Sequence, residues 1–166
     1  MMSKLISKNF YISLLVPFFI FTLDRVSKIY VINLSKNSFD VELFSSKFLN
    51  ITLIWNEGIA FGLFSSSNEY WYNFLTIVIV LIAIVILIMS IRENGAQRYF
   101  FLIVFGGALG NLYDRIFFKA VPDFLDLHVG NFHWFIFNIA DIFITFGVIM
   151  LILWEALPLN KNYEKK

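Results

Sequence analysis

Four apolar stretches, each long enough to cross a lipid bilayer, constrain this chain more than any other feature. They lie at about residues 10–32, 70–91, 99–118 and 135–157. About 20 helical residues span the roughly 30 Å of hydrocarbon in a bilayer. Only 15% of the 166 residues are charged, against about 25% in an average soluble domain. The sequence therefore predicts an α-helical membrane protein with four transmembrane helices, organised as a single domain over residues 1–166.

Composition also excludes several classes of site and partner. The net charge is +1 and the chain has no cysteine. A balanced charge gives no basic surface for nucleic acid, and missing thiols exclude disulfides, thiolate metal ligands and a cysteine nucleophile. The two histidines, His128 and His133, stand five residues apart near the predicted surface, which does not favour a metal site. We expect no nucleic-acid partner, no metal and no cofactor.

Basic residues predict which side of the membrane each end faces, because cytoplasmic loops are enriched in Lys and Arg. No small-residue cleavage site follows the first stretch, so we expect a retained helix and not a removed signal peptide. With both termini in the cytoplasm, that side carries seven basic residues and the outer connections carry three. The inner set is Lys4, Lys8, Arg92, Arg98, Lys161, Lys165 and Lys166, and the outer set is Lys36, Lys47 and Lys119. We therefore expect the functional residues on the outer side.

The first outer connection contains two short segments, Val41 to Phe44 and Phe48 to Trp55, whose β-branched and aromatic residues favour strands. Asn56-Glu57-Gly58 then has the composition of a turn. The sequence predicts a small hairpin on the membrane surface. The second outer connection, at about residues 119–134, ends at Trp134, which fits an aromatic belt at the membrane interface.

Several acidic residues fall at one depth of the predicted membrane domain. A rise of about 1.5 Å per helical residue places Asp24, Asp114 and Asp141 in the outer third of the bilayer, with Asp123 and Asp126 in the loop just above. A carboxylate inside hydrocarbon costs roughly 3 kcal/mol or more. Acids that gather at one depth without an equal number of nearby cations mark a functional site more often than a set of structural ion pairs.

Two local patterns accompany these acids. Asn111 and Asn138 each precede an aspartate, Asp114 and Asp141, by three residues. This spacing places each amide on the same helical face as its carboxyl group. Residues 106–110 are mostly small. Small residues let membrane helices approach each other closely, so we expect this segment to pack against a neighbouring helix.

Two carboxyl groups held together in a poorly solvated place share one proton, so that one acts as an acid and the other as a base. This is the chemistry of aspartic proteases, in which the base takes a proton from an attacking water. The sequence leaves two candidate partners for Asp141. Depth favours Asp114, which adjoins Arg115. Chemistry favours Asp123, because its apolar neighbours would raise its pKa and let it hold a proton.

Five blocks of sequence resemble the signal peptidase II family of bacterial membrane aspartic endopeptidases, and they cover nearly the whole chain. They are Asp24 with Lys28; Asn56 to Gly62; Gly106 to Arg115; Val121-Pro122-Asp123-Phe124; and Phe137 to Asp141. Each block alone is weak, but their order on four predicted membrane helices is specific. Pro122 stands where the family usually has a second apolar β-branched residue, and proline removes one backbone donor beside Asp123.

The resemblance implies that Asp123 and Asp141 form the catalytic pair. It also implies a supporting set, which lines or holds the pocket, and a structural set. The supporting set is Asn56, Asn111, Arg115, Val121 and Asn138, and the structural set is Asp24, Lys28, Gly107 and Asp114. An outer β-cradle over about residues 36–64 with a short lid helix is implied as well.

The implied substrates are prolipoproteins whose cysteine carries a diacylglyceryl group, cut just before that cysteine. The implied location is the bacterial plasma (inner) membrane, with several spans and an active site near the extracytoplasmic face. We expect a monomer surrounded by membrane lipid. The alternative from another class is a proton- or cation-coupled transporter subunit, because intramembrane acids also serve proton relays. Against it, the acids cluster near one face, and the inner half of the predicted membrane domain carries no ionisable groups.

Overall fold

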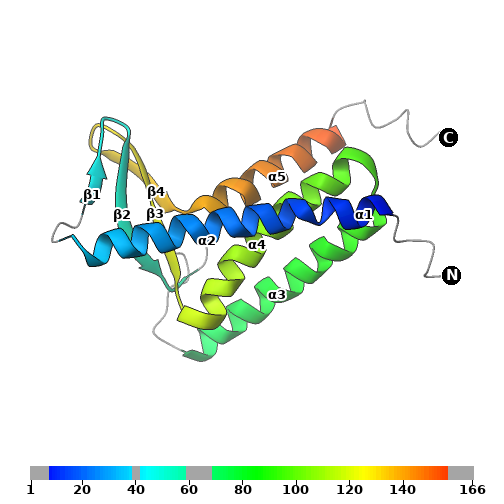
Figure 1. Cartoon of the computed structure of the whole chain (residues 1–166), viewed down its shortest axis with the longest axis horizontal. Helices are drawn as coiled ribbons and strands as arrows, with labels where there is room; N and C mark the ends of the chain where they lie inside the picture. The colour runs from blue at the N-terminus through cyan, green and yellow to red at the C-terminus, as the bar shows by residue number, and fades with distance from the viewer. Residues whose placement is uncertain (1–7, 39–41, 59–68, 157–166) are drawn as a thin grey trace.

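The computed structural model describes residues 8–38, 42–58 and 69–156, which form five helices and four strands. The helices are α1 (Lys8–Ser13), α2 (Leu15–Lys36), α3 (Glu69–Arg92), α4 (Gly95–Phe118) and α5 (Ile139–Ala156). The strands are β1 (Glu42–Ser45), β2 (Leu49–Asn56), β3 (Val121–Val129) and β4 (Phe132–Phe137). Figure 1 shows the helices running lengthwise through the molecule, with the sheet at one end of them.

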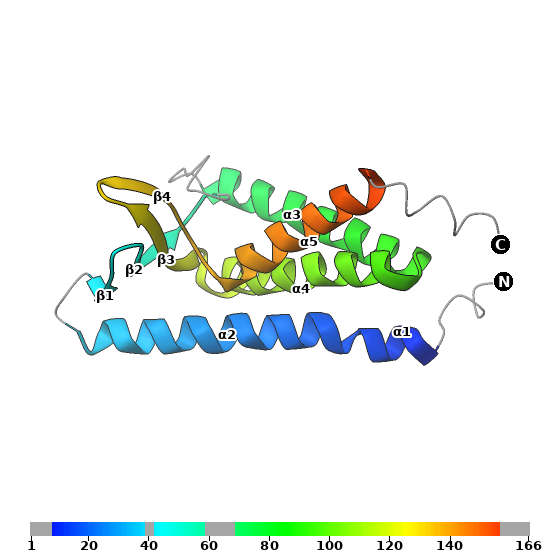
Figure 2. The same ribbon diagram turned by 90° about the horizontal axis from the view of Figure 1, so that it is seen from above.

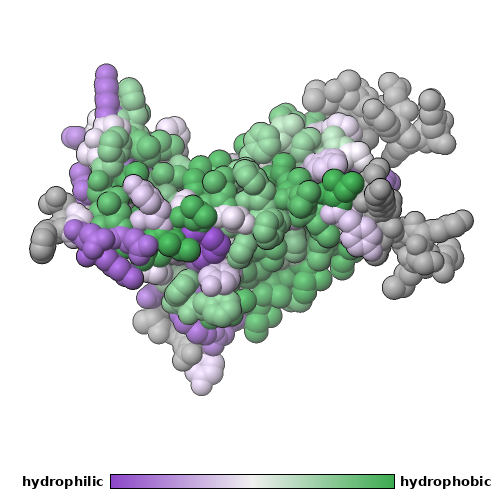
Figure 3. Space-filling model, in the orientation of Figure 1, coloured by the Kyte–Doolittle hydropathy of each residue, from purple (hydrophilic) through white to green (hydrophobic). Residues whose placement is uncertain are grey.

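The helices pack around α4, which contacts α2, α3 and α5 (Figure 2). Three segments are long and apolar enough to cross a membrane, at Tyr70–Arg92, Gly95–Phe118 and Ile139–Ala156. Figure 3 shows that one face of the helical body is mainly hydrophobic, whereas hydrophilic residues gather toward the sheet end. Long helices with exposed apolar faces are typical of membrane-embedded proteins.

The bounds predicted for the first membrane helix, 10–32, differ from those in the structure near both ends. A break at Leu14 separates α1 from α2, and α2 continues to Lys36. Pro17 accounts for the break, because a proline has no N–H to donate to the carbonyl group four residues earlier. The prediction treated this stretch as one uninterrupted helix, and that detail is wrong.

The fourth predicted membrane helix, at 135–157, becomes helical only at Ile139. The residues before it belong to β4, whose aromatic residues favour a strand. Asn138 then stands at the position before the helix, where asparagine is strongly preferred because its side chain can satisfy a free backbone N–H. The two other predicted stretches, 70–91 and 99–118, correspond to α3 and α4.

The four strands form one antiparallel sheet in the order β1-β2-β3-β4. β1 and β2 are the hairpin predicted in the first outer connection, and β3 and β4 add the second connection to it. Pairing of β2 with β3 brings Asn56 opposite Val121 and Ile54 opposite Asp123. The sheet thus carries residues of two distant sequence blocks to one place. The short lid helix expected beside this cradle lies outside the described residues.

Small residues let α4 approach two neighbouring helices. A Cβ atom on Gly107 would lie 2.6 Å from the carbonyl oxygen of Ala140 in α5. A Cβ atom on Gly110 would lie 2.5 Å from Oδ2 of Asp24 in α2. Real Cβ atoms do not come so close to other atoms, so any larger residue would push the helices apart. The small-residue run therefore allows α4 to lie directly between α2 and α5.

Candidate active site

Asp141 lies in the first turn of α5, where it forms reciprocal hydrogen bonds with Asn138. The backbone N–H of Asp141 donates to Oδ1 of Asn138, and the backbone N–H of Asn138 donates to Oδ2 of Asp141, both at 3.1 Å. This is a capping box, in which two residues three positions apart satisfy each other's free N–H groups. The carboxylate of Asp141 is thereby held at the positive end of the helix dipole, which stabilises a negative charge.

Asn138 also connects Asp141 to Asp123. Nδ2 of Asn138 donates to Oδ1 of Asp123 at 2.6 Å, and Nδ2 of Asn56 donates to Oδ2 of Asp123 at 2.8 Å. The Oδ1 atoms of these two asparagines accept backbone N–H groups, from Asp141 and Gly58 respectively. Because a backbone N–H can only donate, the orientation of both amides is determined. Both present their N–H groups to Asp123.

A third asparagine, Asn111 of α4, donates from Nδ2 to Oδ1 of Asp141 at 2.8 Å. Its Oδ1 accepts from Nζ of Lys28 at 2.9 Å, and an ammonium group can only donate. Lys28 therefore fixes which way this amide points. The sequence placed Asn111 beside Asp114 on one helical face, but the structure directs its amide across to α5. A side chain on the neighbouring helix decides the orientation.

Lys28 belongs to a buried cluster of two cations and two carboxylates. Its Nζ contacts Oδ1 of Asp24 at 3.0 Å and Oδ2 of Asp114 at 2.7 Å. Arg25 contacts Oδ2 of Asp24 at 2.8 Å and Oδ1 of Asp114 at 2.5 Å. Lys28, Asp24 and Asp114 are at most 1% exposed. Asp114, the partner that depth favoured, is thus engaged by cations of α2, whereas Asp123 shares Asn138 with Asp141.

The same cluster holds the start of α5. Oδ1 of Asp24 accepts the backbone N–H of Ala140 at 3.1 Å. The first N–H groups of a helix have no partner within that helix, and α2 supplies one here. Members of the predicted structural set therefore orient the amide of Asn111 and the first turn of α5.

Asp123 is 4% exposed, and burial raises its pKa to about 6. The negative charge of Asp141 raises the pKa as well, while hydrogen bonds from Asn56 and Asn138 and the charge of Lys28 oppose the rise. An ordinary aspartate has a pKa near 4 and is ionised throughout the near-neutral range. Asp123 can instead keep its proton close to neutral pH, as a general acid must.

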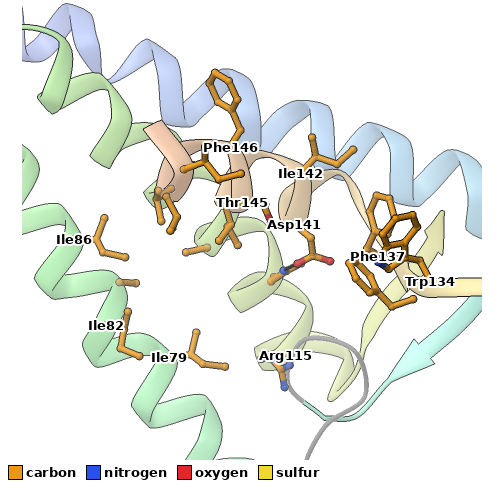
Figure 4. A pocket seen from close by; sticks show the side chains of 18 of the residues that line it. Ile79, Ile82, Ile86, Arg115, Trp134, Phe137, Asp141, Ile142, Thr145 and Phe146 are labelled. Carbon is orange, nitrogen blue, oxygen red and sulfur yellow. Dashed lines mark hydrogen bonds between the residues drawn. The ribbon is translucent and has the colours of Figure 1, made fainter. Parts of the chain in front are cut away.

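A cavity of about 910 Å³ opens between α3, α4 and α5 beside Asp141. Most of its wall is apolar, and Asn111, Arg115 and Asp141 supply charged and amide groups (Figure 4). A mainly apolar cavity with a few convergent polar groups is the usual form of a ligand site. The cavity is therefore the place where a hydrophobic ligand would meet the carboxylate of Asp141.

Arg115 closes one side of this site. Its Nη2 donates to the carbonyl oxygen of Gly58, and its guanidinium lies 5.6 Å from the centre of the Tyr72 ring. Val121 is buried at the start of β3, opposite Asn56. The five residues of the predicted supporting set thus lie around the two aspartates or along the cavity.

Gly58 is a member of the site that was not predicted from the sequence. Its N–H fixes the amide of Asn56, and its carbonyl accepts Arg115. The only sequence signal was its place in the predicted Asn-Glu-Gly turn. A backbone contact of this kind has no side chain that could reveal it.

The two histidines lie away from the aspartate pair on the β3–β4 hairpin. Their rings stack with centroids 5.0 Å apart, His128 contacts Asn50, and His133 contacts Asp126. Over residues 8–38, 42–58 and 69–156, no group of three or more potential metal ligands is present. The polar chemistry of the described site is thus that of carboxyl, amide and guanidinium groups.

A family model and the named relatives point to one family, and a solved structure shares the fold. A family model described as signal peptidase (SPase) II matches residues 16–157. The chain is 50% identical over 165 residues to a lipoprotein signal peptidase of Pelagibacter ubique (strain HTCC1062), covering 99% of both chains. It is 41% identical over 148 residues to a lipoprotein signal peptidase of Anaplasma phagocytophilum (strain HZ), covering 87% of this chain and 91% of the relative. A bacterial membrane enzyme solved by the in meso method at 2.3 Å matches with a TM-score of 0.74 and 33% identity, covering 93% of this chain and 91% of the other.

Proposed function

The chain belongs to the signal peptidase II family, and on this premise we propose that it is an aspartic endopeptidase of diacylglyceryl-modified prolipoproteins. It removes the signal peptide by cutting just before the lipidated cysteine. One observation carries the aspartic assignment: Asn138 hydrogen-bonds to both Asp123 and Asp141. That link places the two carboxyl groups in one hydrogen-bonded unit, and the charge of Asp141 raises the pKa of Asp123, as expected of two carboxyl groups held near each other.

In the proposed mechanism Asp141 is the base and Asp123 is the acid. Asp141 is stabilised as a carboxylate by Asn111, by the N–H of Asn138 and by the helix dipole. It takes a proton from water as the water oxygen attacks the carbonyl carbon of the scissile amide. Asp123 gives its proton to the carbonyl oxygen, which produces a neutral tetrahedral intermediate. Asp141 then protonates the leaving nitrogen as the C–N bond breaks, and the hydroxyl proton returns to Asp123.

We also propose that four helices cross the membrane, with both termini in the cytoplasm and the sheet on the outer side. α2 has 22 residues, enough to span a bilayer. Of its charged residues, Asp24 and Lys28 are buried against α4, and Arg25, whose side chain is 13% exposed, pairs with Asp24 and Asp114. Lys36 is the last residue of the helix. The aspartate pair then lies near the outer surface. There, the lipid anchor of a substrate would hold the cleaved bond at the height of Asp141.

Cleavage of a defined substrate tests this function. The purified protein, in detergent, is incubated with a prolipoprotein that carries the diacylglyceryl group and with the same protein lacking it. We expect mass spectrometry to show the first cut just before the cysteine, and the second left intact. No cleavage of the modified substrate, or a cut at another bond, would reject the assignment. The transporter alternative has no support from the family or the relatives.

A further inference from the structure

Thr145 carries a hydroxyl group in the apolar part of the cavity (Figure 4). It follows Asp141 by four residues, so both side chains lie on one face of α5 and about 6 Å apart along the helix axis. Most other residues that line the cavity, such as Ile82 of α3 and Ile149 of α5, are apolar. The side chain of Thr145 is thus a polar group one helical turn away from the aspartate pair.

This hydroxyl group differs from four others on the helices. Thr22 and Thr76 donate to the carbonyl group four residues earlier, and Ser27 and Ser90 to the one three residues earlier. Such bonds to the preceding turn satisfy a hydroxyl in apolar surroundings. Within the part of the chain that the structure describes, the Thr145 hydroxyl makes no hydrogen bond. It is free to bind a molecule that enters the cavity.

A signal peptide that crosses the membrane as a helix brings unpaired groups to this cavity. The last four carbonyl groups of a helix have no partner within it. In hydrocarbon each unpaired carbonyl must find a donor, because water is absent. The segment just before the cut therefore needs donors from the enzyme at more than one level below the scissile bond.

The distance between Asp141 and Thr145 along α5 indicates which substrate residue lies opposite Thr145. Where the substrate has left its helix and is extended just before the cut, a separation of about 6 Å from Asp141 corresponds to about two residues, at roughly 3.3 Å each. We propose that the Thr145 hydroxyl donates to a backbone carbonyl of the signal peptide about two residues before the cleaved bond. The inference rests on the proposed function and names a further contact of the same site. Thr145 positions the substrate and does not react.

The test compares Thr145→Val, which keeps the shape of the side chain and removes the hydroxyl, with Thr145→Ser, which keeps the hydroxyl. With the diacylglyceryl-modified prolipoprotein, kcat/KM should fall roughly tenfold in the valine variant, the size expected for one lost hydrogen bond to a buried carbonyl. The loss should appear mainly in KM. The serine variant should stay within about twofold of the unmodified enzyme, and the thermal midpoint of both variants should not change.

Thr22→Val is the matched control, because the Thr22 hydroxyl donates to the carbonyl group of Phe18 in its own helix and Thr22 does not line the cavity. It should leave kcat/KM unchanged. The proposal is overturned if Thr145→Val cleaves as well as the unmodified enzyme, or if Thr145→Ser is as impaired as Thr145→Val. If the unmodified enzyme does not cleave the substrate at all, the proposed function itself fails. That outcome is distinct from the two results that overturn only the role of Thr145.

Discussion

Asp24 and Ala140, 116 positions apart in the chain, are joined by a hydrogen bond of 3.1 Å from the backbone N–H of Ala140 to Oδ1 of Asp24. Ala140 is completely buried, and Gly107 of α4 packs directly against its carbonyl group. Three helices thus meet at the residue that precedes Asp141. Their packing sets the position of this carboxyl group.

Gly107→Ala should therefore impair turnover more than its effect on stability suggests. The added Cβ would press on the carbonyl of Ala140, and a shift of about 1 Å in a reacting group can cost roughly a hundredfold in rate. Gly106→Ala is the control, because its Cβ would press on Pro17 of α2 instead. Activity and thermal midpoints should be measured for both. An equal loss of turnover in the two variants at equal stability would contradict this reading.

Two substitutions of Asn138 separate its capping role from its role as a donor to Asp123. Serine is a good N-cap residue but lacks the amide donor, whereas alanine lacks both, and loss of a cap costs about 1 kcal/mol. Asn138→Ser should keep a thermal midpoint near that of the unmodified protein, and Asn138→Ala should lower it. Both should lose turnover alike. A fully active serine variant would show that the bond to Asp123 is dispensable.

Much of the fold follows from the sequence alone. The length and hydropathy of the apolar stretches predicted the helices that became α3 and α4, and strand-forming residues predicted β1 and β2. The start of α5 was misplaced, because the run of aromatic residues in β4 is as apolar as a membrane helix. Only the backbone pairing of β4 with β3 distinguishes this strand from the start of a membrane helix, and hydropathy does not report backbone pairing.

The candidate site was predicted in part. Depth and pKa reasoning singled out acids that the structure gathers around the start of α5, but the two lines of reasoning disagreed on the partner of Asp141. The resemblance to a family favoured Asp123. Hydrogen-bond orientation could not be predicted. It depends on contacts between distant segments, such as Lys28 with Asn111 and Gly58 with Asn56. Sequence spacing reports neighbours on one helix, but these contacts join different elements.

The pH dependence of cleavage should reflect the proton on Asp123. With its pKa raised to about 6, the acid loses its proton as pH rises through that value, so kcat should fall there. The bond from Asn56 lowers this pKa. Asn56→Ala should therefore raise it and move the falling limb upward by about half to one pH unit, since a hydrogen bond contributes roughly 1 kcal/mol and one unit is about 1.4 kcal/mol. A limb that stays in place, or moves downward, would contradict the assignment of the acid.

Asp114→Asn should chiefly affect folding. Asp114 is fully buried between Arg25 and Lys28, and removing one partner of a buried ion pair typically costs about 3–5 kcal/mol. We expect a lower thermal midpoint and a lower yield of folded protein, with turnover per folded molecule within about tenfold of the unmodified enzyme. Normal folding combined with a complete loss of turnover would instead place Asp114 in the chemistry.

The most direct test of the central claim is kcat for Asp123→Asn and Asp141→Asn, each confirmed to be folded by its thermal midpoint and measured on the diacylglyceryl-modified prolipoprotein. Each amide keeps the shape of its carboxyl group but cannot take part in the proton transfers. We predict that kcat falls by about a thousandfold or more in both variants. A folded variant of either kind that cleaves within about tenfold of the unmodified enzyme would contradict a catalytic pair made of these two residues.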